Sequence, residues 1–138
     1  MHGPVHDDGG VQEGEFRDGQ LHGHGKDEMA SGSVYEGQWK EGKRHGKGRY
    51  VGASGDVYEG EWEAGLKHGY GKETEPDGIT SYEGEHQRGQ YHGKGKYTFD
   101  DGVVLITAWL ADEPVGQGVQ CSADRTQVWE VQDGEELD

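Results

Sequence analysis

Histidines are the residues whose type and spacing most suggest chemistry in this chain. One phrase beginning with histidine recurs at steps of 23, 23 and 24 residues: His22-Gly23-His24-Gly25, His45-Gly46-Lys47-Gly48, His68-Gly69-Tyr70-Gly71 and His92-Gly93-Lys94-Gly95. Two ligands on one zinc ion lie about 3 to 3.5 Å apart, because Zn–N bonds are about 2.0 to 2.1 Å long. If each copy belongs to one hairpin of a sheet, equivalent atoms in successive copies are roughly 10 Å apart. Neighbouring copies therefore cannot share an ion, and we predict no metal site and no cofactor beyond an incidental surface site at His22 and His24.

Paired carboxylates and the single cysteine are the remaining candidates for catalysis. Glu59 and Glu61 could act as an acid and a base, but such groups need a pocket that shifts their pKa values. Acids recur at these positions in other copies, so we expect a solvated rim. The segment 42–48 lacks the Gly-Lys-(Ser/Thr) ending of a phosphate-binding loop, and Cys121 has no histidine at a suggestive spacing. Because an enzyme needs one asymmetric constellation of groups, we predict no catalytic residue and a non-enzymatic chain.

A second phrase recurs in phase with the histidines, and it indicates what must position them. Its copies are Gln12-Glu13-Gly14-Glu15-Phe16, Tyr35-Glu36-Gly37-Gln38-Trp39, Tyr58-Glu59-Gly60-Glu61-Trp62 and Tyr82-Glu83-Gly84-Glu85-His86. A fixed period of this length is the signature of a repeat array. With 29% hydrophobic residues and a net charge of -15 the composition is close to that of a disordered chain, but aromatic residues held in register argue for a folded one.

Each repeat is predicted to be a β-hairpin. Tyr35, Gly37 and Trp39 alternate with polar residues, as in a half-buried strand. Gly42 supplies a turn, and the segment 43–51 runs back as the second strand of the hairpin. Glycines beside aromatic residues in every unit indicate that Tyr and Trp rings lie over the glycine backbone of adjacent strands. The expected fold is all-β: an elongated, single-layer antiparallel solenoid of β-hairpin repeats with an aromatic groove.

These residues resemble the MORN repeat (membrane occupation and recognition nexus). Tyr-Glu-Gly-(Glu/Gln)-Trp, a glycine turn and His-Gly-x-Gly recur in phase over about residues 11 to 105. The resemblance implies an all-β solenoid of hairpins with a groove on one side. Three positions depart from the pattern: Gln12 and His86 replace aromatic residues of the first phrase, and Glu73 stands where Tyr50 and Tyr97 predict an aromatic residue.

The array divides the chain into three parts. Residues 1–10 resemble the second half of a repeat and form an N-terminal edge, so the chain either opens on a half-repeat or belongs to something longer. Residues 11–105 form four MORN-like repeats. Residues 106–138 form a degenerate repeat, with Trp109 in phase, and a C-terminal cap with an acidic tail, as the end of a solenoid requires.

The aromatic stripe is the predicted binding site. The predicted partner-binding groove consists of Tyr35, Trp39, Tyr50, Tyr58, Trp62, Tyr70, Tyr82, His86, Tyr97 and Trp109. Tyr70, Glu73 and His86 break the symmetry of the aromatic face and are expected to discriminate between partners. Because Trp and Tyr are enriched among binding hot spots and a large exposed apolar patch usually marks an interface, we predict a protein–protein interaction scaffold that holds a partner helix or peptide. The alternative is that the stripe is internal packing.

Similarity to MORN proteins adds expectations about setting. It implies scaffolds in cytoskeletal, ciliary or membrane-apposed assemblies, some of which self-associate as homodimers. It also leaves open that the chain is the accessory region of a larger enzyme, since MORN arrays resemble parts of certain lysine methyltransferases and plant phosphoinositide kinases.

Charge narrows the class of partner. A net charge of -15 disfavours nucleic acid, which rewards clustered Lys and Arg. The basic cluster available for weak contact with anionic lipid such as phosphoinositides is Lys40, Lys43, Arg44, Lys47 and Arg49. The lone Cys121 forms no internal disulfide, and no apolar run has the length of a membrane span. We therefore expect a cytoplasmic protein, associated with the cytoskeleton or a membrane.

Overall fold

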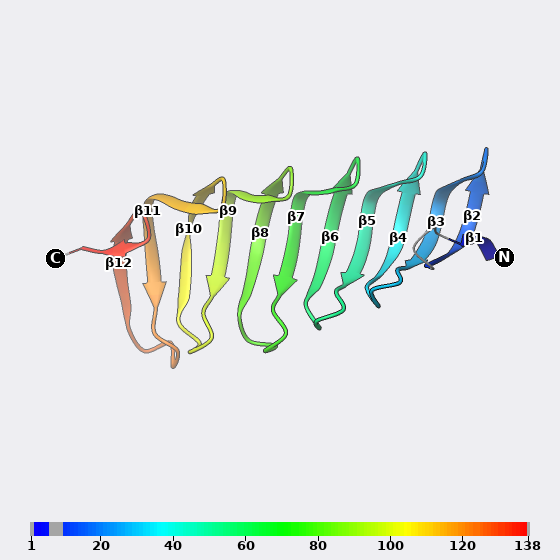
Figure 1. Cartoon of the computed structure of the whole chain (residues 1–138). Helices are drawn as coiled ribbons and strands as arrows, with labels where there is room; N and C mark the ends of the chain where they lie inside the picture. Colours follow the sequence, from blue (N-terminus) through cyan, green and yellow to red (C-terminus); the bar gives the residue numbers. More distant parts are fainter. Residues whose placement is uncertain (1, 6–9, 138) are drawn as a thin grey trace.

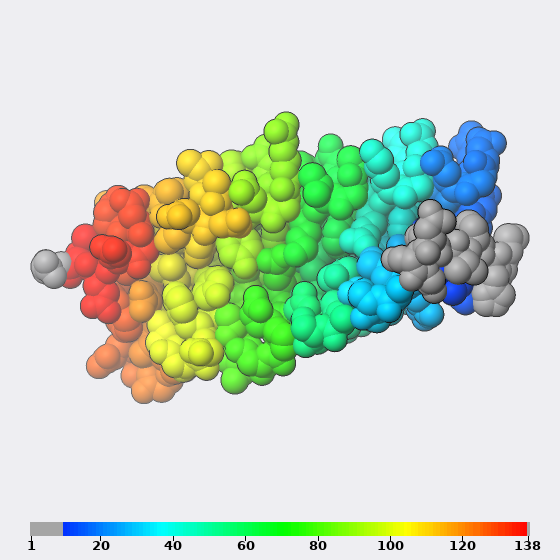
Figure 2. Space-filling model, in the orientation of Figure 1, coloured from blue at the N-terminus to red at the C-terminus, as the bar shows by residue number. Residues whose placement is uncertain are grey.

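A single antiparallel sheet makes up the whole fold. The computed structural model describes residues 2–5 and 10–137, and within them thirteen strands pair in the order of the sequence, with no helix among the described residues. The strands run side by side from the blue N-terminal end to the red C-terminal end (Figure 1). In the space-filling view the molecule is correspondingly longer than it is wide (Figure 2). The predicted all-β solenoid of hairpins is confirmed.

Strands of seven and nine residues alternate through the array. The bounds are β1 His2–Val5, β2 Val11–Arg17, β3 Gln20–Glu28, β4 Val34–Lys40, β5 Lys43–Val51, β6 Val57–Glu63, β7 Leu66–Thr74, β8 Ser81–Gln87, β9 Gln90–Thr98, β10 Val104–Leu110, β11 Glu113–Cys121, β12 Val128–Gln132 and β13 Glu135–Glu136. β1 pairs with β2 at the N-terminal edge. The rest of the predicted N-terminal half-repeat, Met1 and residues 6–9, lies outside the described residues.

Two-residue turns close each hairpin. In the turn between β4 and β5, Glu41 and Gly42 have φ values of 51° and 79°. Positive φ at both central residues is the signature of the type I′ turn, whose twist matches that of the flanking strands. Glycine supplies the second residue in most of these turns, but the turn between β10 and β11 uses Ala111 and Asp112. The predicted glycine turn at Gly42 is confirmed.

Cross-strand register separates two faces of the sheet. Gly37 of β4 is paired with Gly48 of β5, which is paired with Gly60 of β6. We call the side toward which Tyr35 and its equivalents point the aromatic face, and the opposite side, which carries the charged residues of the strands, the polar face. Because side chains alternate along a strand, neighbouring residues in the sequence lie on different faces.

An unbroken row of rings fills the aromatic face. Each tyrosine of the first phrase meets the ring that ends its own phrase, Trp or His, and the ring at the same position in the next repeat. The Tyr35 ring centroid is 5.1 Å from Trp39 and 5.3 Å from Trp62, with near-perpendicular planes. Edge-to-face contacts of this kind are the preferred geometry of aromatic pairs. We call the row the aromatic ladder; its members in order are Trp39, Tyr35, Trp62, Tyr58, His86, Tyr82 and Trp109.

Ring polar atoms and glycines explain why the ladder fits against the sheet. The Tyr35 hydroxyl donates to the Gln38 carbonyl over 3.0 Å, and Trp39 Nε1 donates to the Gly25 carbonyl over 2.9 Å. A Cβ atom at Gly48 would overlap the Tyr35 ring. The rings therefore lie directly on glycine backbone, as predicted, and the polar atoms of the ladder tyrosines and tryptophans bond to backbone carbonyls.

The C-terminal strands close one end of the ladder. β10 and β11 form a hairpin of the same shape as the others, with Leu105 in the position of the tyrosines. Leu105 and Trp109 form a buried cluster with Tyr82 and with Val131 of β12. These contacts cover the last ring, which would otherwise be exposed at the end of the array.

Candidate functional site

Most of the predicted groove residues are buried by the chain itself. Seven of the ten have exposed fractions of 6% or less: Tyr35, Trp39, Tyr58, Trp62, Tyr82, His86 and Trp109. The prediction that they form an exposed apolar patch is wrong for these seven, because they pack in the ladder. The alternative interpretation of the stripe, internal packing, describes them.

One residue from the second strand of each hairpin covers the ladder. Arg44 Cζ lies 4.9 Å from the Tyr35 ring centroid and 5.1 Å from that of Trp62, a cation–π geometry. Lys67 covers the next tyrosine in the same way, with Nζ 5.0 Å from the Tyr58 centroid.

The covering position changes residue type from repeat to repeat. In the fourth repeat Tyr91 stacks on Tyr82, with 3.8 Å between ring centroids, and in the first Leu21 is itself buried. The positions 21, 44, 67 and 91 keep the repeat spacing while the residue types differ. Sequence reasoning missed these residues because no shared phrase marks them.

Tyr50 and Tyr97 are the half-buried members of the predicted groove. Tyr50 lies beside a shallow cleft of about 360 Å³ on the aromatic face. The cleft is lined by Met29, Arg44, Tyr50, Trp62, Gly65, Leu66, Lys67 and Gly89. Leu66 is 49% exposed, so an apolar side chain meets solvent in this cleft.

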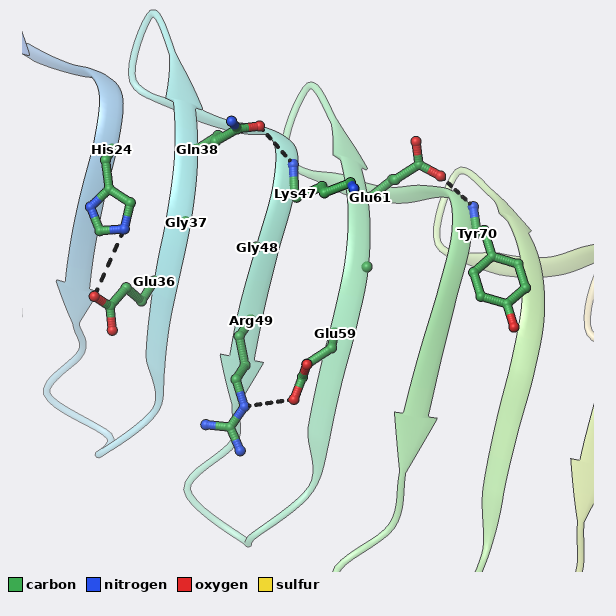
Figure 3. A pocket seen from close by; sticks show the side chains of 11 residues that line it. His24, Glu36, Gly37, Gln38, Lys47, Gly48, Arg49, Glu59, Glu61 and Tyr70 are labelled. Atoms are coloured by element: carbon green, nitrogen blue, oxygen red, sulfur yellow. Dashed lines mark hydrogen bonds and ion pairs between the residues drawn. The ribbon is translucent and has the colours of Figure 1, made fainter.

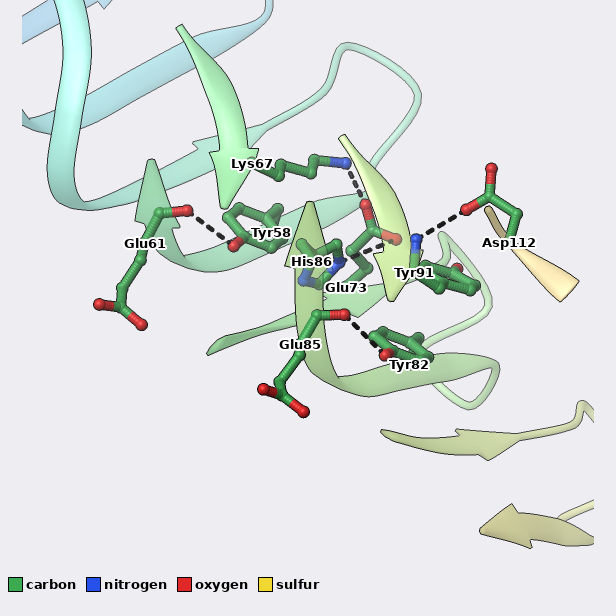
Figure 4. Close-up of polar contacts among 9 residues, drawn as sticks. All are labelled: Tyr58, Glu61, Lys67, Glu73, Tyr82, Glu85, His86, Tyr91 and Asp112. Atoms are coloured by element: carbon green, nitrogen blue, oxygen red, sulfur yellow. Dashed lines mark hydrogen bonds and ion pairs between the residues drawn. The ribbon is translucent and has the colours of Figure 1, made fainter. Parts of the chain in front are cut away.

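A partly buried carboxylate, Glu73 of the third repeat, lies beside the ladder next to His86 of the fourth (Figure 4). Glu73 forms an ion pair with Lys67, and its Oε2 lies 3.8 Å from His86 Nε2. Burial alone would raise the pKa of Glu73, but the contacts with His86 and Lys67 outweigh it and lower that pKa to about 2. Glu73 is therefore ionised at neutral pH. It occupies the repeat position that Tyr50 and Tyr97 occupy in the second and fourth repeats.

His86 stands in the ladder where other repeats have tryptophan. Its ring centroid is 5.2 Å from Tyr58 and 5.1 Å from Tyr82, so it keeps the edge-to-face order. Neither ring nitrogen has a hydrogen-bond partner among the described residues, and the side chain is fully buried. His86 and Glu73 lie side by side on the aromatic face, as predicted.

Tyr70 lies on the polar face. It is 55% exposed and lines an open groove with Glu61, whereas a Cβ at the next residue, Gly71, would point toward Tyr58 on the aromatic face. Its assignment to the aromatic groove is wrong. Strand alternation gives the reason, because Tyr70 occupies the same repeat position as Lys47.

A wide open groove lies on the polar face (Figure 3). This groove has a volume of about 770 Å³ and runs across β3 to β7. It is lined by His24, Glu36, Gly37, Gln38, Lys47, Gly48, Arg49, Glu59, Gly60, Glu61 and Tyr70. We call it the polar groove.

Charges of alternating sign form one side of the polar groove. Glu36 is paired across the strands with Arg49, and Arg49 with Glu59. Arg49 Nε donates to Glu59 over 2.9 Å. The alternation continues beyond the groove with Lys72, Glu83 and Lys96, of which the last two lie 3.7 Å apart.

Comparison with known families decides what these hairpins are. A family model of the MORN repeat matches residues 13–34, 35–57, 58–80 and 82–104, which is most of the chain. The chain belongs to the MORN repeat family. MORN repeats are interaction repeats that contact proteins or membranes. A comparison with curated proteins finds no match.

The fourth residue of the MORN phrase has a structural function that the sequence did not reveal. Each hairpin contains a bulge after the paired glycines, such as the register shift between Gly37 and Trp39. Gln38 Oε1 accepts the backbone N–H of Lys47 over 2.9 Å, and Glu61 Oε2 accepts that of Tyr70 over 2.8 Å. These side chains therefore hold the bulge, and describing Glu61 as only part of a solvated rim was incomplete.

The basic residues of the predicted lipid contact are distributed over the MORN hairpin. Arg44 covers rings on the aromatic face, whereas Lys47 and Arg49 line the polar groove. Lys40 and Lys43 flank the tight turn beside Glu41 and Glu63. The structure thus does not bring the five basic side chains to one surface.

Two histidines of the MORN repeats each lie near a glutamate. His24 Nε2 lies 3.9 Å from Glu36, and His68 Nε2 lies 3.3 Å from Glu63. Within residues 2–5 and 10–137, no three His, Cys, Asp or Glu side chains are placed to hold a metal ion. Cys121 is a half-buried free thiol. In the same described ranges, no helix has the length and apolar character needed to cross a membrane.

Proposed function

We propose that this MORN array is a non-enzymatic scaffold that holds a helix or peptide of a partner protein in the polar groove. The observation that carries the proposal is the groove itself: an open space of about 770 Å³ with side chains of both charges along it. The residues of the repeated phrases have structural functions in the ladder and the bulges. Among the residues that line the groove, those at positions 24, 47 and 70 differ in type from repeat to repeat, and these are the ones that can select a partner.

The length of the polar groove suits a short segment of a partner protein. The groove crosses five strands, and four strand spacings of about 4.8 Å give roughly 19 Å. That length fits about thirteen residues of α-helix or about six residues of extended chain. Charges of one sign recur on every second strand, roughly 10 Å apart, so the complementary segment carries opposite charges at the same interval.

Tyr70 is the expected anchor. It is the large aromatic side chain exposed in the groove, and tyrosine combines apolar area with a hydroxyl, which makes it frequent among hot spots. Arg49 and Glu59 supply the neighbouring charges. Because their ion pair is exposed, it contributes little to stability and can be exchanged for contacts with a partner.

The test is affinity capture from cell lysate with three matched proteins: the wild type, the groove variant Arg49→Glu/Tyr70→Ala and the control variant Ile79→Ala/Arg88→Glu. The control carries changes of the same kind at exposed positions outside the groove. We expect a partner retained by the wild type and the control and lost by the groove variant. Equal retention by all three would refute the groove. Replacing Trp39 or Trp62 by Ala would not test the groove, because both rings are buried in the ladder.

The setting and the alternative partners are also proposals. We propose a cytoplasmic protein at a cytoskeletal or membrane-apposed assembly, and a larger enzyme remains the alternative context for the array. Direct contact with anionic lipid is the alternative mode for MORN repeats. Co-sedimentation with phosphoinositide vesicles at low salt, where charge attraction is least screened, distinguishes it from protein binding.

A further inference from the structure

Strands of the polar face carry their charges on either side of a glycine. On β5, Lys47 and Arg49 flank Gly48, and on β6, Glu59 and Glu61 flank the glycine paired with it. Because side chains alternate along a strand, both flanking residues lie on the polar face. β3, β5 and β7 carry a base directly after the glycine, and β4, β6 and β8 carry an acid directly before it. The polar face is therefore striped with charges of alternating sign.

A row of glycines forms the floor between the flanking residues. Gly37, Gly48 and Gly60 line the polar groove and are paired with one another across β4, β5 and β6. The residues on either side of a glycine are two positions apart, or about 6.6 Å. An α-helix is about 10–12 Å wide with its side chains, so it would rest on the charged side chains and would not reach the floor. A thinner chain that runs along the row of glycines can reach it.

The period of the stripes selects a conformation for this chain. Strands of one sign are two strand spacings apart, which is about 9.4 to 9.8 Å. A polyproline II helix has three residues per turn and rises about 3.1 Å per residue, so it presents the same side every three residues, or about 9.3 Å. A β-strand presents the same side every two residues, about 6.7 Å, and two turns of α-helix rise about 10.8 Å. Polyproline II is therefore the conformation that stays in step with the hairpins.

The bases of the polar groove are more available than its acids. Glu61 Oε2 already accepts a backbone N–H of the next strand, and Glu59 is paired with Arg49. Lys47 and Lys72 are exposed, and no described residue forms an ion pair with either. A ligand with negative charges would therefore meet bases that are free to bind it.

The net charge of the chain does not oppose an anion at this site. Residues 40–98 carry ten acids and ten bases, so the net charge of -15 comes from the two ends. Exposed charges more than about 10 Å away are largely screened at 0.1 M salt. The sign of the ligand is therefore decided by the side chains of the groove itself.

Each basic strand can hold one carboxylate over its glycine. On β5 the carboxylate would lie between Lys47 and Arg49, and on β7 between the hydroxyl of Tyr70 and Lys72, all of which donate hydrogen bonds. β3 offers a histidine and a lysine in the same arrangement. From β3 to β7 there are four strand spacings, about 19 Å, and six steps along a polyproline II helix cover about 18.6 Å. Seven residues with an acid at the first, fourth and seventh positions therefore match the groove.

Tyr70 gives the residues between the acids an apolar contact. It is 55% exposed and lines the polar groove. Proline-rich segments dock on exposed aromatic side chains, and their preformed conformation reduces the entropy lost on binding. These residues also pass over the acidic strands, where a neutral proline avoids placing a second carboxylate beside Glu36 or Glu59.

We propose that the polar groove binds a proline-rich segment in the polyproline II conformation that carries aspartate or glutamate at every third residue. This inference rests on the proposed function and specifies the partner segment. The acids of the segment bind over β3, β5 and β7, and its prolines lie over β4 and β6 and against Tyr70.

Fluorescence anisotropy with labelled seven-residue peptides tests the spacing and the sign. The triplet peptide has three glutamates, each separated from the next by two prolines. The alternating peptide has the same composition with one proline between glutamates, so its acids face three different sides of a polyproline II helix. The basic peptide has lysine in place of each glutamate of the triplet peptide. The triplet peptide should bind at least about tenfold more tightly than the other two. Equal binding of the triplet and alternating peptides, or tighter binding of the basic peptide, would overturn the proposal.

Matched variants test whether the triplet peptide binds in the groove. Lys47→Gln/Arg49→Gln removes both bases of β5. Lys40→Gln/Lys43→Gln removes two exposed bases of the same hairpin that flank its tight turn, outside the groove. The first variant should bind the triplet peptide at least about tenfold more weakly, and the second should bind it as the wild type does. Circular dichroism checks that both are folded, and equal affinities of the two variants would contradict binding in the groove.

The conformation of the segment and the proposed function can fail separately. An alanine-rich helical peptide with glutamate at every seventh residue serves as the further probe. If it binds more tightly than the triplet peptide, or if the triplet peptide does not bind while affinity capture still loses a partner with Arg49→Glu/Tyr70→Ala, the polyproline II assignment is overturned and the groove stands. If no peptide binds and all three capture proteins retain the same partners, both proposals are refuted.

Discussion

The phenol of Tyr58 occupies the space in which a side chain at Gly71 would begin. A Cβ atom built on Gly71 lies well within 3.0 Å of the Tyr58 ring and its oxygen. The same oxygen donates to the Glu61 carbonyl over 3.0 Å, so the ring cannot move aside without losing a hydrogen bond. The glycine of one strand and the tyrosine of its neighbour are thus one structural unit.

Gly71→Ala should therefore lower the free energy of unfolding by about 1–3 kcal/mol, the usual cost of forcing an extra carbon into a packed site. Chemical denaturation followed by circular dichroism measures the change. Lys72→Ala, next to it on the polar face, is the control and should change stability by no more than about 0.5 kcal/mol. Equal stability of the two variants would contradict the close contact.

Trp62→Ala should unfold the array more easily, by about 3–5 kcal/mol, because it leaves a cavity in the ladder. Tyr70→Ala removes a ring of similar size from an exposed position and should change stability by no more than about 0.5 kcal/mol. Thermal denaturation of both variants makes the comparison. A loss of binding without a loss of stability in Trp62→Ala would show that this ring contacts a partner.

Glu61→Ala should destabilise the bulge by about 1 kcal/mol, since the backbone N–H of Tyr70 loses its acceptor. Glu61→Gln should be close to neutral, because Gln38 makes the same contact in the preceding repeat. Glu59→Ala, two residues away on the same face, is the control. Hydrogen exchange at the Tyr70 amide reports the local change directly, and similar protection in Glu61→Ala and Glu59→Ala would exclude this role.

Glu73 should make the free energy of unfolding decrease at acidic pH. Its pKa falls from 4.5 to about 2 on folding, so its contribution is fully present above pH 4.5 and is lost as the pH falls toward 2. At neutral pH this amounts to about 3 kcal/mol at most. The measurement is the difference in unfolding free energy between the wild type and Glu73→Gln across this range. A difference that stays constant with pH would contradict an ionised Glu73.

The ladder tyrosines should make the free energy of unfolding decrease at alkaline pH. Burial raises the pKa of Tyr35 to about 12, although Arg44 and the hydrogen bond to Gln38 oppose the rise, and burial also raises the pKa of Tyr58. A raised pKa in the folded state means that stability is intact below pH 10 and is lost as the pH rises toward 12. Tyrosinate absorbance and circular dichroism should therefore change together in this range. Titration of all tyrosines near pH 10 without unfolding would refute it.

Local pattern was enough to predict the hairpins and the family. Alternation in 35–39, the turn at Gly42 and the regular spacing of tryptophans each follow from the neighbouring residues. The solvent exposure of the aromatic rings could not be predicted from neighbouring residues. Whether Tyr35 is covered depends on Arg44, whose position is constant in the array but whose type is not. A stripe of rings therefore looks the same in the sequence whether it is open or covered.

Basic residues that are neighbours in the sequence do not share a surface in the structure, so the predicted basic cluster was misleading. Lys43 and Arg44 are adjacent in the chain, yet Arg44 covers aromatic rings while Lys43 lies beside the tight turn. Tyr70 was misplaced for the same reason, although the alternation applied to Lys47 would have assigned it correctly. The polar groove depends on the curvature of the sheet and on bulges, which no single repeat reveals.

Because the repeats stack through equivalent contacts, the length of the array depends on the number of repeats. Units of about 23 residues stack in the same way along the array, so deleting 35–57 would join Val34 to Tyr58 and place Trp62 against the first repeat, where Trp39 lies now. The molecule would shorten by two strand spacings, roughly 10 Å, with both ends unchanged. Gain or loss of units can thus set the distance between whatever is attached at the two ends in fixed steps, without altering any single interface.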